Sequence, residues 1–290
     1  MNPTSDDTVF IGIPCYNRPD GLRRTIADIQ AQTHKNWVAV ISDNASPNGE
    51  VERVGRQAAA SDTRISYVRQ EHNIGAVANF RFLAESAGEP YFIWASDDDL
   101  REPELLATTL AILAEHPRHA LAFTSIDNIN RDDVVYRIYP GLAHLSSGES
   151  RLEDARNFIE DSEIMGKANI IYGLYRTAEL QQAIGEFWDD AGLEEHGGDI
   201  VFVFGLICRH PIVGTDRVLL HKRTQSAKTS YRLKRPSRGY FVPLGKYRRY
   251  VERHVAVAPS PQFKAMVRER LRRRLIDKYL FRLGRMFRVV

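Results

Sequence analysis

Short apolar runs alternate with longer amphipathic stretches over the first 125 residues, and this alternation constrains the fold more than any other feature. Apolar runs bounded by turn residues indicate buried strands, and apolar residues three and four positions apart indicate helices. Strands are predicted at residues 9–14, 37–42, 65–68, 91–95 and 120–124, with helices beginning near residues 19, 75 and 102. This alternation predicts a doubly wound, mostly parallel α/β sheet with helices on both faces.

The alternation weakens beyond residue 127. Strands are predicted at 134–139, 169–175 and 212–220, and helices at 152–160 and 177–184. Residues 200–209 are almost all apolar, which indicates a buried helix or strand. We predict that residues 1–125 and 126–226 are the two halves of one α/β domain. Residues 227–290 are predicted to form a basic, mainly helical C-terminal extension.

Charge separates the end of the chain from the rest. Residues 227–290 contain 19 Lys and Arg against 3 Asp and Glu, whereas residues 1–226 contain 21 against 34. Residues 263–290 combine an apolar helical stripe with many arginines, which is typical of helices that lie on anionic membranes. The alternative is packing on the acidic body or on a second copy in a homo-oligomer. Nucleic acid is not expected as a partner, because no recognised binding motif is present and the acidic body would repel a polyanion.

The usual signs of secretion and of membrane spans are missing from the sequence. Cys15 and Cys208 are too few for a disulfide framework or a zinc site. The first ten residues have no secretory pattern, and the longest apolar run, nine residues at 200–208, is far shorter than the roughly 20 that cross a bilayer. We expect a cytoplasmic protein, peripheral to the inner face of the membrane where its extension binds lipid.

Polar residues gather after three predicted strands, where an open parallel sheet binds its ligands. They are Tyr16, Asn17 and Arg18, then Asp43 and Asn44, then Asp97, Asp98 and Asp99. Neither G-x-G-x-x-G after the first strand nor G-x-x-x-x-G-K-[ST] is present, which argues against dinucleotide and P-loop chemistry. Three consecutive aspartates suit Mg²⁺ or Mn²⁺ with substrate phosphates as further ligands. A solvated acidic turn that also caps the helix near residue 102 is the alternative for the triplet, and a turn-forming role is the alternative for Asp43.

Three segments together resemble a known enzyme family. They are VFIGIPCYNRPDGLRRTIADIQAQTHKNWVAVISDNAS, RQEHNIGAVANF and EPYFIWASDDDL. They are similar to the nucleotide-binding half of family-2 glycosyltransferases of the GT-A fold. The resemblance covers residues 8–125 closely and 165–225 more loosely. It implies a GT-A-like sheet and a nucleotide-diphosphate sugar as donor.

The resemblance also implies which residues bind the nucleotide and the metal. The nucleotide-binding candidates are Pro14, Tyr16, Asn17, Arg18 and Asp43 around the nucleoside, with Asn73 and Gly75 nearby. In the triplet, we expect Asp99 on the metal, with Asp97 as the second ligand, and Asp97 or Asp98 on the ribose. Ser96 stands where many relatives carry the first aspartate of the motif, so the resemblance leaves open which pair acts.

Residues 192–199 are implied to supply the general base. Asp199 best matches the acid that family members carry before an apolar helix, and Glu195 and His196 are the alternatives. The structural alternative for Asp199 is an N-cap of the helix that begins there. After the strand at 212–220, His221 and Arg223 are implied to close over the diphosphate, with a solvated basic cluster as the alternative.

Together, these inferences predict a glycosyltransferase that moves a sugar from a nucleotide-diphosphate donor to a hydroxyl of a glycan or lipid-linked saccharide. Mn²⁺ or Mg²⁺ would offset the charge of the leaving group. One carboxylate acting as base would give inversion by single displacement. The alternatives are a sugar-nucleotide nucleotidyltransferase, or non-enzymatic binding of an anionic surface or nucleic acid through the basic extension.

Overall fold

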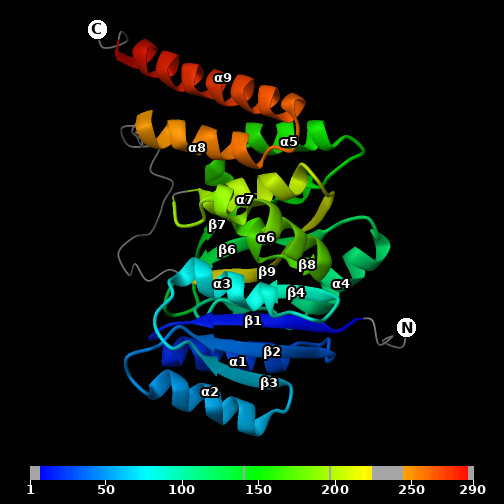
Figure 1. Cartoon of the computed structure of the whole chain (residues 1–290), viewed down its shortest axis with the longest axis vertical. Helices are drawn as coiled ribbons and strands as arrows, with labels where there is room; N and C mark the ends of the chain where they lie inside the picture. The colour runs from blue at the N-terminus through cyan, green and yellow to red at the C-terminus, as the bar shows by residue number, and fades with distance from the viewer. Residues whose placement is uncertain (1–6, 140, 196, 224–243, 287–290) are drawn as a thin grey trace.

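A mixed sheet runs through the part of the chain that the computed structural model describes, residues 7–139, 141–195, 197–223 and 244–286. The strand order is β3-β2-β1-β4-β8-β6-β9-β5, with β7 paired to β6 (Figure 1). The strands are β1 (Val9–Cys15), β2 (Trp37–Asp43), β3 (Ile65–Arg69), β4 (Tyr91–Trp94), β5 (Leu100–Arg101), β6 (Leu121–Ile129), β7 (Val135–Ile138), β8 (Leu174–Arg176) and β9 (Ile212–Arg223). The helices are α1 (Pro19–Ala31), α2 (Glu50–Ser61), α3 (Ala76–Glu85), α4 (Leu105–Glu115), α5 (Arg151–Glu160), α6 (Thr177–Ala191), α7 (Gly198–Ile207), α8 (Leu244–Val257) and α9 (Pro261–Met286).

Strand pairing is parallel in the first half of the sheet and mixed in the second. β1 pairs with β2 and β4, and β2 pairs with β3, all in parallel, as expected for strands joined by helices. β6 and β9 are also parallel, whereas β8 joins β4 to β6 in antiparallel orientation. The predicted α/β fold is confirmed, and its antiparallel pairs involve β5, β7 and β8.

Helices cover both faces of the sheet and enclose two apolar cores. α1, α2 and α4 cover one face, where Ile11 and Ile13 of β1 share a core with Leu22 of α1. Because side chains alternate along a strand, Phe10 of β1 points to the other face, where it shares a core with Trp94 of β4. α3, α6 and α7 contribute to this second core. Each fully buried aliphatic or aromatic side chain contributes roughly 1.5–3 kcal/mol, so the two cores hold the sheet rigidly.

Two local predictions differ from the structure, and a third, which left helix and strand open, is decided by it. The patterns above predict no element at residues 50–61, yet α2 forms there and buries Val51, Val54 and Ala58 on one face. Residues 169–175, predicted as a strand, form a 3₁₀ segment at Lys167–Tyr172 followed by the short β8. Residues 200–209 form a helix and not a strand, and the residues of α7 are apolar on every side because protein surrounds them.

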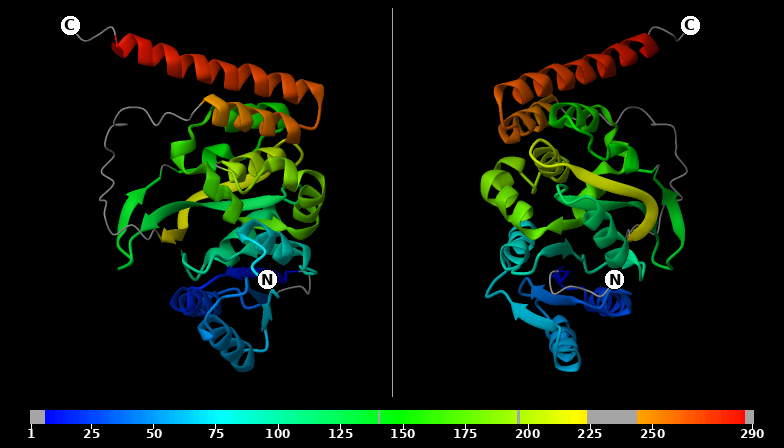
Figure 2. Two further views of the ribbon diagram at one scale, coloured as in Figure 1. Left: turned by 60° about the vertical axis from the view of Figure 1, so that its left-hand side comes forward. Right: turned by 90° about the vertical axis from the view of Figure 1, so that its right-hand side faces the viewer.

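The described part of the basic extension packs on the body. α8 lies against α6 and α7, and α9 lies against α8 and α5 (Figures 1 and 2). Met266, Val267 and Leu271 of α9 are buried, so this part of its apolar stripe faces protein. Arg270 Nη1 lies 2.6 Å from Glu160 Oε1, which pairs the basic helix with the acidic body. For this stretch, packing on the protein itself is therefore the correct alternative.

The rest of the predicted extension, residues 227–243 and 287–290, lies outside the described residues. Among the helices that the structure describes, none combines the length and the apolar character that a membrane crossing requires. The boundaries of the three predicted regions stay a prediction. α8 and α9 nevertheless share the second apolar core with α6 and α7, because Tyr247, Val257 and Leu271 belong to it.

Candidate active site

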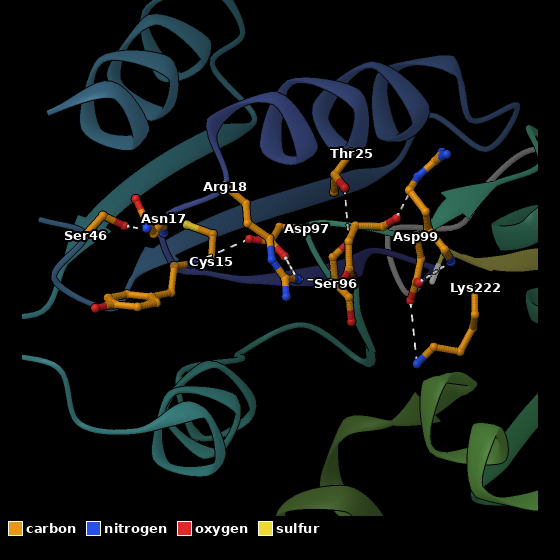
Figure 3. Close-up of polar contacts among 12 residues, drawn as sticks. Cys15, Asn17, Arg18, Thr25, Ser46, Ser96, Asp97, Asp99 and Lys222 are labelled. Carbon is orange, nitrogen blue, oxygen red and sulfur yellow. Dashed lines mark hydrogen bonds and ion pairs between the residues drawn. The ribbon is translucent and has the colours of Figure 1, made fainter. Parts of the chain in front are cut away.

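The carboxyl ends of β1, β2 and β4 bring three polar loops together at one edge of the sheet. Cys15 at the end of β1 is in register with Asp43 at the end of β2, and Gly12 is in register with Trp94 at the end of β4. The loops at residues 16–18, 44–46 and 95–99 therefore lie near one another (Figure 3). Open α/β sheets bind their ligands at such an edge.

Arg18 links two aspartates of the triplet to the loop after β1. Its Nη1 donates to Asp97 Oδ1 at 3.1 Å and to Asp98 Oδ2 at 2.6 Å (Figure 3). The backbone N–H of Tyr16 donates to the other oxygen of Asp97 at 3.4 Å. Burial raises the pKa of Asp97 to about 6, and the positive charge of Arg18 opposes that rise. Arg18 therefore offsets part of the negative charge that the aspartates bring to the site.

Asp99 has one carboxylate oxygen without a hydrogen-bond partner among the described residues. Its side chain is 1% exposed, and Oδ1 accepts from the backbone N–H of Arg223 at 3.1 Å, whereas the buried Oδ2 has no such partner. Lys222 Nζ lies 3.9 Å from Oδ2 and 3.9 Å from the centre of the Tyr172 ring (Figure 3). Burial raises the pKa of Asp99, and Lys222 opposes this rise. Because an unsatisfied buried acceptor costs about 1–3 kcal/mol, Oδ2 is suited to a further cationic ligand.

Buried hydrogen bonds hold the backbone of the triplet against α1. Arg101, at the end of β5, donates from Nη2 to Ser96 O at 2.9 Å, and Thr25 Oγ1 of α1 donates to the same oxygen at 3.0 Å. A Cβ on Gly21 would lie 2.0 Å from Asp97 O, so glycine is needed for this close approach. The triplet is therefore more than the solvated turn that was the alternative interpretation.

Asp43 is fully buried, and protein groups donate to both of its oxygens. The N–H and hydroxyl of Ser46 donate to Oδ1 at 2.9 and 2.6 Å. Tyr67 OH and Arg69 Nη1 donate to Oδ2 at 2.8 and 3.0 Å. Ala45, which lies between Asp43 and Ser46, has a φ of 58°, so the carboxylate stabilises a strained turn. This geometry agrees with the turn-forming alternative, and a nucleoside contact from Asp43 stays a prediction that requires these donors to move.

The other nucleoside candidates follow β1. Pro14 is in register with Ser42 of β2 inside the sheet. Asn17 has a φ of 56° and donates its N–H to Ser46 Oγ at 2.9 Å. Tyr16 is 45% exposed, and an exposed ring beside a ligand-binding edge is suited to stacking on a base. The structure therefore places Tyr16 and Asn17 in the same loop as Arg18, and Pro14 near the end of β1, just before that loop.

Asn44 joins the end of β2 to the loop before α3. Its Nδ2 donates to Asn73 Oδ1 at 3.1 Å, and its Oδ1 accepts from the N–H of Ile74 at 2.9 Å. Gly75 has a φ of 86°, a conformation that favours glycine, and α3 begins at the next residue. Asn73 and Gly75 therefore lie at the same sheet edge as the other predicted nucleotide residues, and their contact with a nucleotide stays a prediction.

His221 and Lys222 are neighbours on β9 with different partners. His221 Nδ1 lies 2.6 Å from Asp127 Oδ1, and its Nε2 lies 2.9 Å from Glu102 Oε1. Lys222, on the opposite side of the strand, faces the triplet through Asp99. Lys222 was not among the predicted site residues, although the alternation along this strand could have identified it. A diphosphate contact from His221 stays a prediction.

Arg223 connects the triplet to the β6–β7 hairpin. Its Nε donates to Asp98 O at 3.1 Å, and its Nη1 donates to Asn130 O at 3.0 Å and forms an ion pair with Asp133. The side chain is 7% exposed. The side chain is therefore not part of a solvated cluster, and its contact with a diphosphate stays a prediction.

Asp199 lies in the first turn of α7, whereas the triplet lies in the loop after β4. The N-cap of α7 is Gly197, with a φ of 79°, so Asp199 is not the N-cap; its Oδ1 accepts from the N–H of the next residue at 2.8 Å. An acidic side chain in the first turn still stabilises the helix through its dipole. Glu195, an alternative base, lies 3.4 Å from Arg249 of α8. His196, the other alternative, lies outside the described residues.

A cavity of about 590 Å³ is lined by Asp199, by its neighbours Glu194, Glu195, Gly197 and Ile200, and by α8. Its volume is in the range of small-molecule binding sites. The resemblance implies Asp199 as the base, and residues 227–290 are predicted to be mainly helical. Neither prediction indicates that α8 packs here, because α8 is distant in sequence. The cavity therefore adds a second group of candidate site residues to those at the sheet edge.

The carboxylates of the triplet fit a metal that is bound mainly by a substrate. Among the described residues, no three His, Cys, Asp or Glu side chains gather into a site that could hold an ion alone. Mg²⁺ or Mn²⁺ on a diphosphate needs only one or two protein carboxylates, because phosphate oxygens and water complete its coordination. The unpartnered Asp99 Oδ2 fits that role, whereas both oxygens of Asp97 already accept hydrogen bonds.

Sequence comparison relates the chain to glycosyltransferases. The sequence profile of glycosyl transferase family 2 matches residues 10–173. The putative glycosyltransferase EpsE of Bacillus subtilis is 28% identical over 126 residues, which are 43% of this chain and 45% of that protein. An uncharacterized glycosyltransferase of Rickettsia conorii is 32% identical over 133 residues, which are 45% of this chain and 19% of that protein. The chain thus spans less than half the length of these curated relatives.

Solved structures share the fold at low sequence identity. TarS 1–349 of S. aureus, solved in complex with UDP-GlcNAc, gives a TM-score of 0.62 at 14% identity over 91% of this chain and 70% of that one. The mannosyltransferase PcManGT from Pyrobaculum calidifontis, in complex with GDP-Man and Mn²⁺, gives 0.53 at 14% identity over 90% and 68%. These likenesses support the expected GT-A fold. Because the family profile covers more than half of the chain and includes the aspartate triplet, this protein belongs to glycosyl transferase family 2.

Proposed function

We propose that the chain transfers a glycosyl group from a nucleoside-diphosphate sugar to a hydroxyl of a saccharide or lipid-linked saccharide. The observation that carries the proposal is the buried Asp99 Oδ2, which accepts no hydrogen bond among the described residues and lies beside Lys222 at the ligand-binding edge of the sheet. A diphosphate that brings a divalent cation would satisfy this oxygen, and fixed cations would face its phosphates. The nucleotidyltransferase alternative is not favoured, because the chain belongs to family 2.

The donor is proposed to lie along the edge formed by β1, β2 and β4. The exposed ring of Tyr16 would stack on the base, and Asp97 or Asp98 would accept hydrogen bonds from the ribose hydroxyls. Asp99 would hold Mn²⁺ or Mg²⁺. Support for this donor class comes from TarS, solved with UDP-GlcNAc, and PcManGT, solved with GDP-Man and Mn²⁺. When bound, the metal supplies Lewis-acid stabilisation of the leaving diphosphate.

The proposed chemistry is a single displacement. Asp199 accepts the proton of the acceptor hydroxyl while that oxygen attacks the anomeric carbon, and the bond to the diphosphate breaks on the opposite side of the ring. The anomeric configuration therefore inverts, through a transition state of oxocarbenium character as in glycoside hydrolysis. Lys222 is proposed to face the charge that develops on the departing diphosphate, where a fixed cation stabilises it.

Peripheral membrane contact is proposed for the outer side of α9. Arg268, Arg272 and Arg273 are exposed, whereas the apolar side chains at 266, 267 and 271 are buried in the protein. The contact should therefore be electrostatic, and exchanging these three arginines for glutamate should abolish co-sedimentation with vesicles that contain anionic lipid. Binding that is equal on neutral vesicles, or that is unchanged in the variant, would contradict this proposal.

Release of nucleoside diphosphate tests the main proposal. The protein is incubated with a panel of UDP-, GDP-, ADP- and dTDP-sugars with Mn²⁺, and thermal shift with the free nucleoside diphosphates is measured in parallel. We expect one nucleotide to stabilise the protein in a metal-dependent manner and its sugar to be hydrolysed slowly without an acceptor. Neither stabilisation nor release with any member of the panel would refute the proposed function.

A further inference from the structure

The cavity beside Asp199 is lined by other elements than the sheet edge that is proposed to bind the donor. Its lining lies outside the loops after β1, β2 and β4. It consists of residues of α8 and of Glu163, Ala168, Glu194, Glu195, Gly197, Asp199 and Ile200. α8 lies against α6 and α7 (Figure 1), and side chains of α8 line one side of the cavity. A general base must contact the acceptor hydroxyl, so a cavity that contains the proposed base is suited to the acceptor.

Glycines in the α6–α7 turn allow α8 to approach closely. A Cβ on Gly197 would lie 3.0 Å from the ring of Tyr250, and a Cβ on Gly192 would lie 2.7 Å from Arg253 Cδ. Both glycines have positive φ values, 79° and 60°. Arg253 Nη1 donates to Gly192 O at 2.9 Å, which satisfies a carbonyl at the end of α6. The turn and α8 are therefore built to fit each other.

Ion pairs add to this fit. Glu195 Oε2 lies 3.4 Å from Arg249 Nε and 3.9 Å from Arg253 Nη2. Because Glu195 is half exposed, each pair alone contributes little to stability. Their effect is geometric, since they tie to α8 the same turn that leads directly into Asp199. α8 thus positions the proposed base and also forms one wall of the cavity.

The charges of the cavity indicate what it can hold. Its lining has four carboxylates and three cations: Glu163, Glu194, Glu195 and Asp199, and Lys246, Arg249 and Arg253. Arg249 and Arg253 both face the same carboxylate, Glu195. The other three carboxylates of the lining outnumber its one other cation, Lys246, and this excess of negative charge would repel a polyanion. Lys246 and Glu194 are exposed and have no ion pair within the described residues, which leaves one donor group and one acceptor group for a ligand. Mixed donors and acceptors beside tyrosine side chains suit the hydroxyls and ring faces of a sugar.

We infer that α8 forms one wall of the acceptor site and that the unit bound there is an uncharged saccharide. This inference rests on the proposed glycosyl transfer with Asp199 as base. It assigns part of the basic extension to substrate recognition, in addition to any contact that α9 makes with a membrane.

The test compares variants along α8. Lys246→Ala and Arg249→Ala change exposed side chains at the cavity, and Arg248→Ala changes a neighbour that pairs with Glu252 and does not line it. The acceptors are neutral p-nitrophenyl glycosides and the same sugars as 6-phosphates. We expect transfer to a neutral glycoside, with its KM raised roughly two- to tenfold in the two cavity variants and unchanged in Arg248→Ala. Nucleotide affinity should stay at its wild-type value in all three variants, and Arg248→Ala should also keep the wild-type rate of donor hydrolysis.

Each other outcome has a defined meaning. If wild-type protein hydrolyses a nucleotide sugar but transfers to no neutral glycoside, or transfers with a KM that the cavity variants leave unchanged, the inference is overturned and the proposed function stands. Preference for the phosphorylated sugars would overturn the uncharged class. If wild-type protein neither binds nor hydrolyses any nucleotide sugar, the proposed function itself fails.

Discussion

At the edge of the sheet, each proposed donor residue lies within a few positions of a strand end, whereas the proposed base at the start of α7 is held by a helix from near the end of the chain. Asp97 and Asp99 are positioned by the register of β1 with β4 and by hydrogen bonds from Arg18 and Arg223. Asp199 instead depends on how α8 packs on the α6–α7 turn. Register between neighbouring strands therefore builds the sheet edge, the proposed donor side. Packing between distant segments builds the cavity beside Asp199, the proposed acceptor side.

If the two sides are independent, loss of the base should abolish transfer and leave the donor site intact. Asp199→Asn keeps the shape and a hydrogen-bond acceptor but cannot take the proton, so we expect the transfer rate to fall about 10²–10⁴-fold. Asp190→Asn, an exposed acid at the end of α6, is the matched control. Steady-state kinetics measures the loss, and thermal shift with nucleoside diphosphate should be unchanged. An Asp199→Asn protein that folds and keeps full turnover would remove Asp199 from the mechanism.

The converse change should affect the donor side alone. Asp99→Asn removes the charge of the oxygen that is proposed to hold the metal, so Mn²⁺ should no longer strengthen nucleotide binding. We expect roughly a tenfold or greater loss of affinity with Mn²⁺ and little change without it, since the metal's contribution is worth several kcal/mol. Isothermal titration with and without Mn²⁺ measures both values, with Asp132→Asn in the exposed β6–β7 turn as control. Equal Mn²⁺ dependence in the variant and the wild type would assign the metal elsewhere.

Crowding of the triplet should show how rigid the donor side is. Gly21→Ala places a methyl group 2.0 Å from the backbone oxygen of Asp97, which can be relieved only by moving α1 or the triplet. We expect a loss of about 1–3 kcal/mol in the free energy of unfolding together with weaker nucleotide binding. Gly88→Ala, where a Cβ meets nothing within 4 Å, should leave both unchanged. Urea denaturation of the two variants provides the measurement, and equal stabilities would show that the triplet is loosely held.

The sequence predicts the residues of the sheet edge better than it predicts the cavity beside Asp199. The strand pattern and the polar residues after each strand place Tyr16, Arg18 and the triplet at one edge, because parallel strands align their carboxyl ends. Asp199 was recognised by resemblance, but its cavity was not, since α8 reaches it only through tertiary packing. Asp43 shows a different limit: its four donors come from three separate positions, and no pattern in the sequence indicates that they converge on it.

A buried lysine near the proposed acceptor cavity shows whether the packed interior there tolerates a positive charge. Lys167 is 1% exposed; its Nζ donates to Phe158 O and, at 2.9 Å, to Asp161 O. Burial lowers its pKa to about 7 from an ordinary value of 10.5. Between those two pH values the unfolded chain binds more protons than the folded one, so this group's stabilising contribution is fully present above pH 10.5 and is lost as the pH falls through about 7.

Lys167→Met removes that dependence. The difference in unfolding free energy, wild type minus variant, should rise with pH by at most about 1.4 kcal/mol per pH unit and level off near the upper pKa. Urea denaturation from pH 6 to 10 measures this slope, and Lys35→Met at an exposed lysine provides the baseline. A flat difference would mean that Lys167 keeps its proton equally in both states. The backbone carbonyls at the C-terminal end of α5 would then stabilise a fully charged, buried ammonium group. The interior near the proposed acceptor cavity would in that case hold a buried charge, as the sheet edge does.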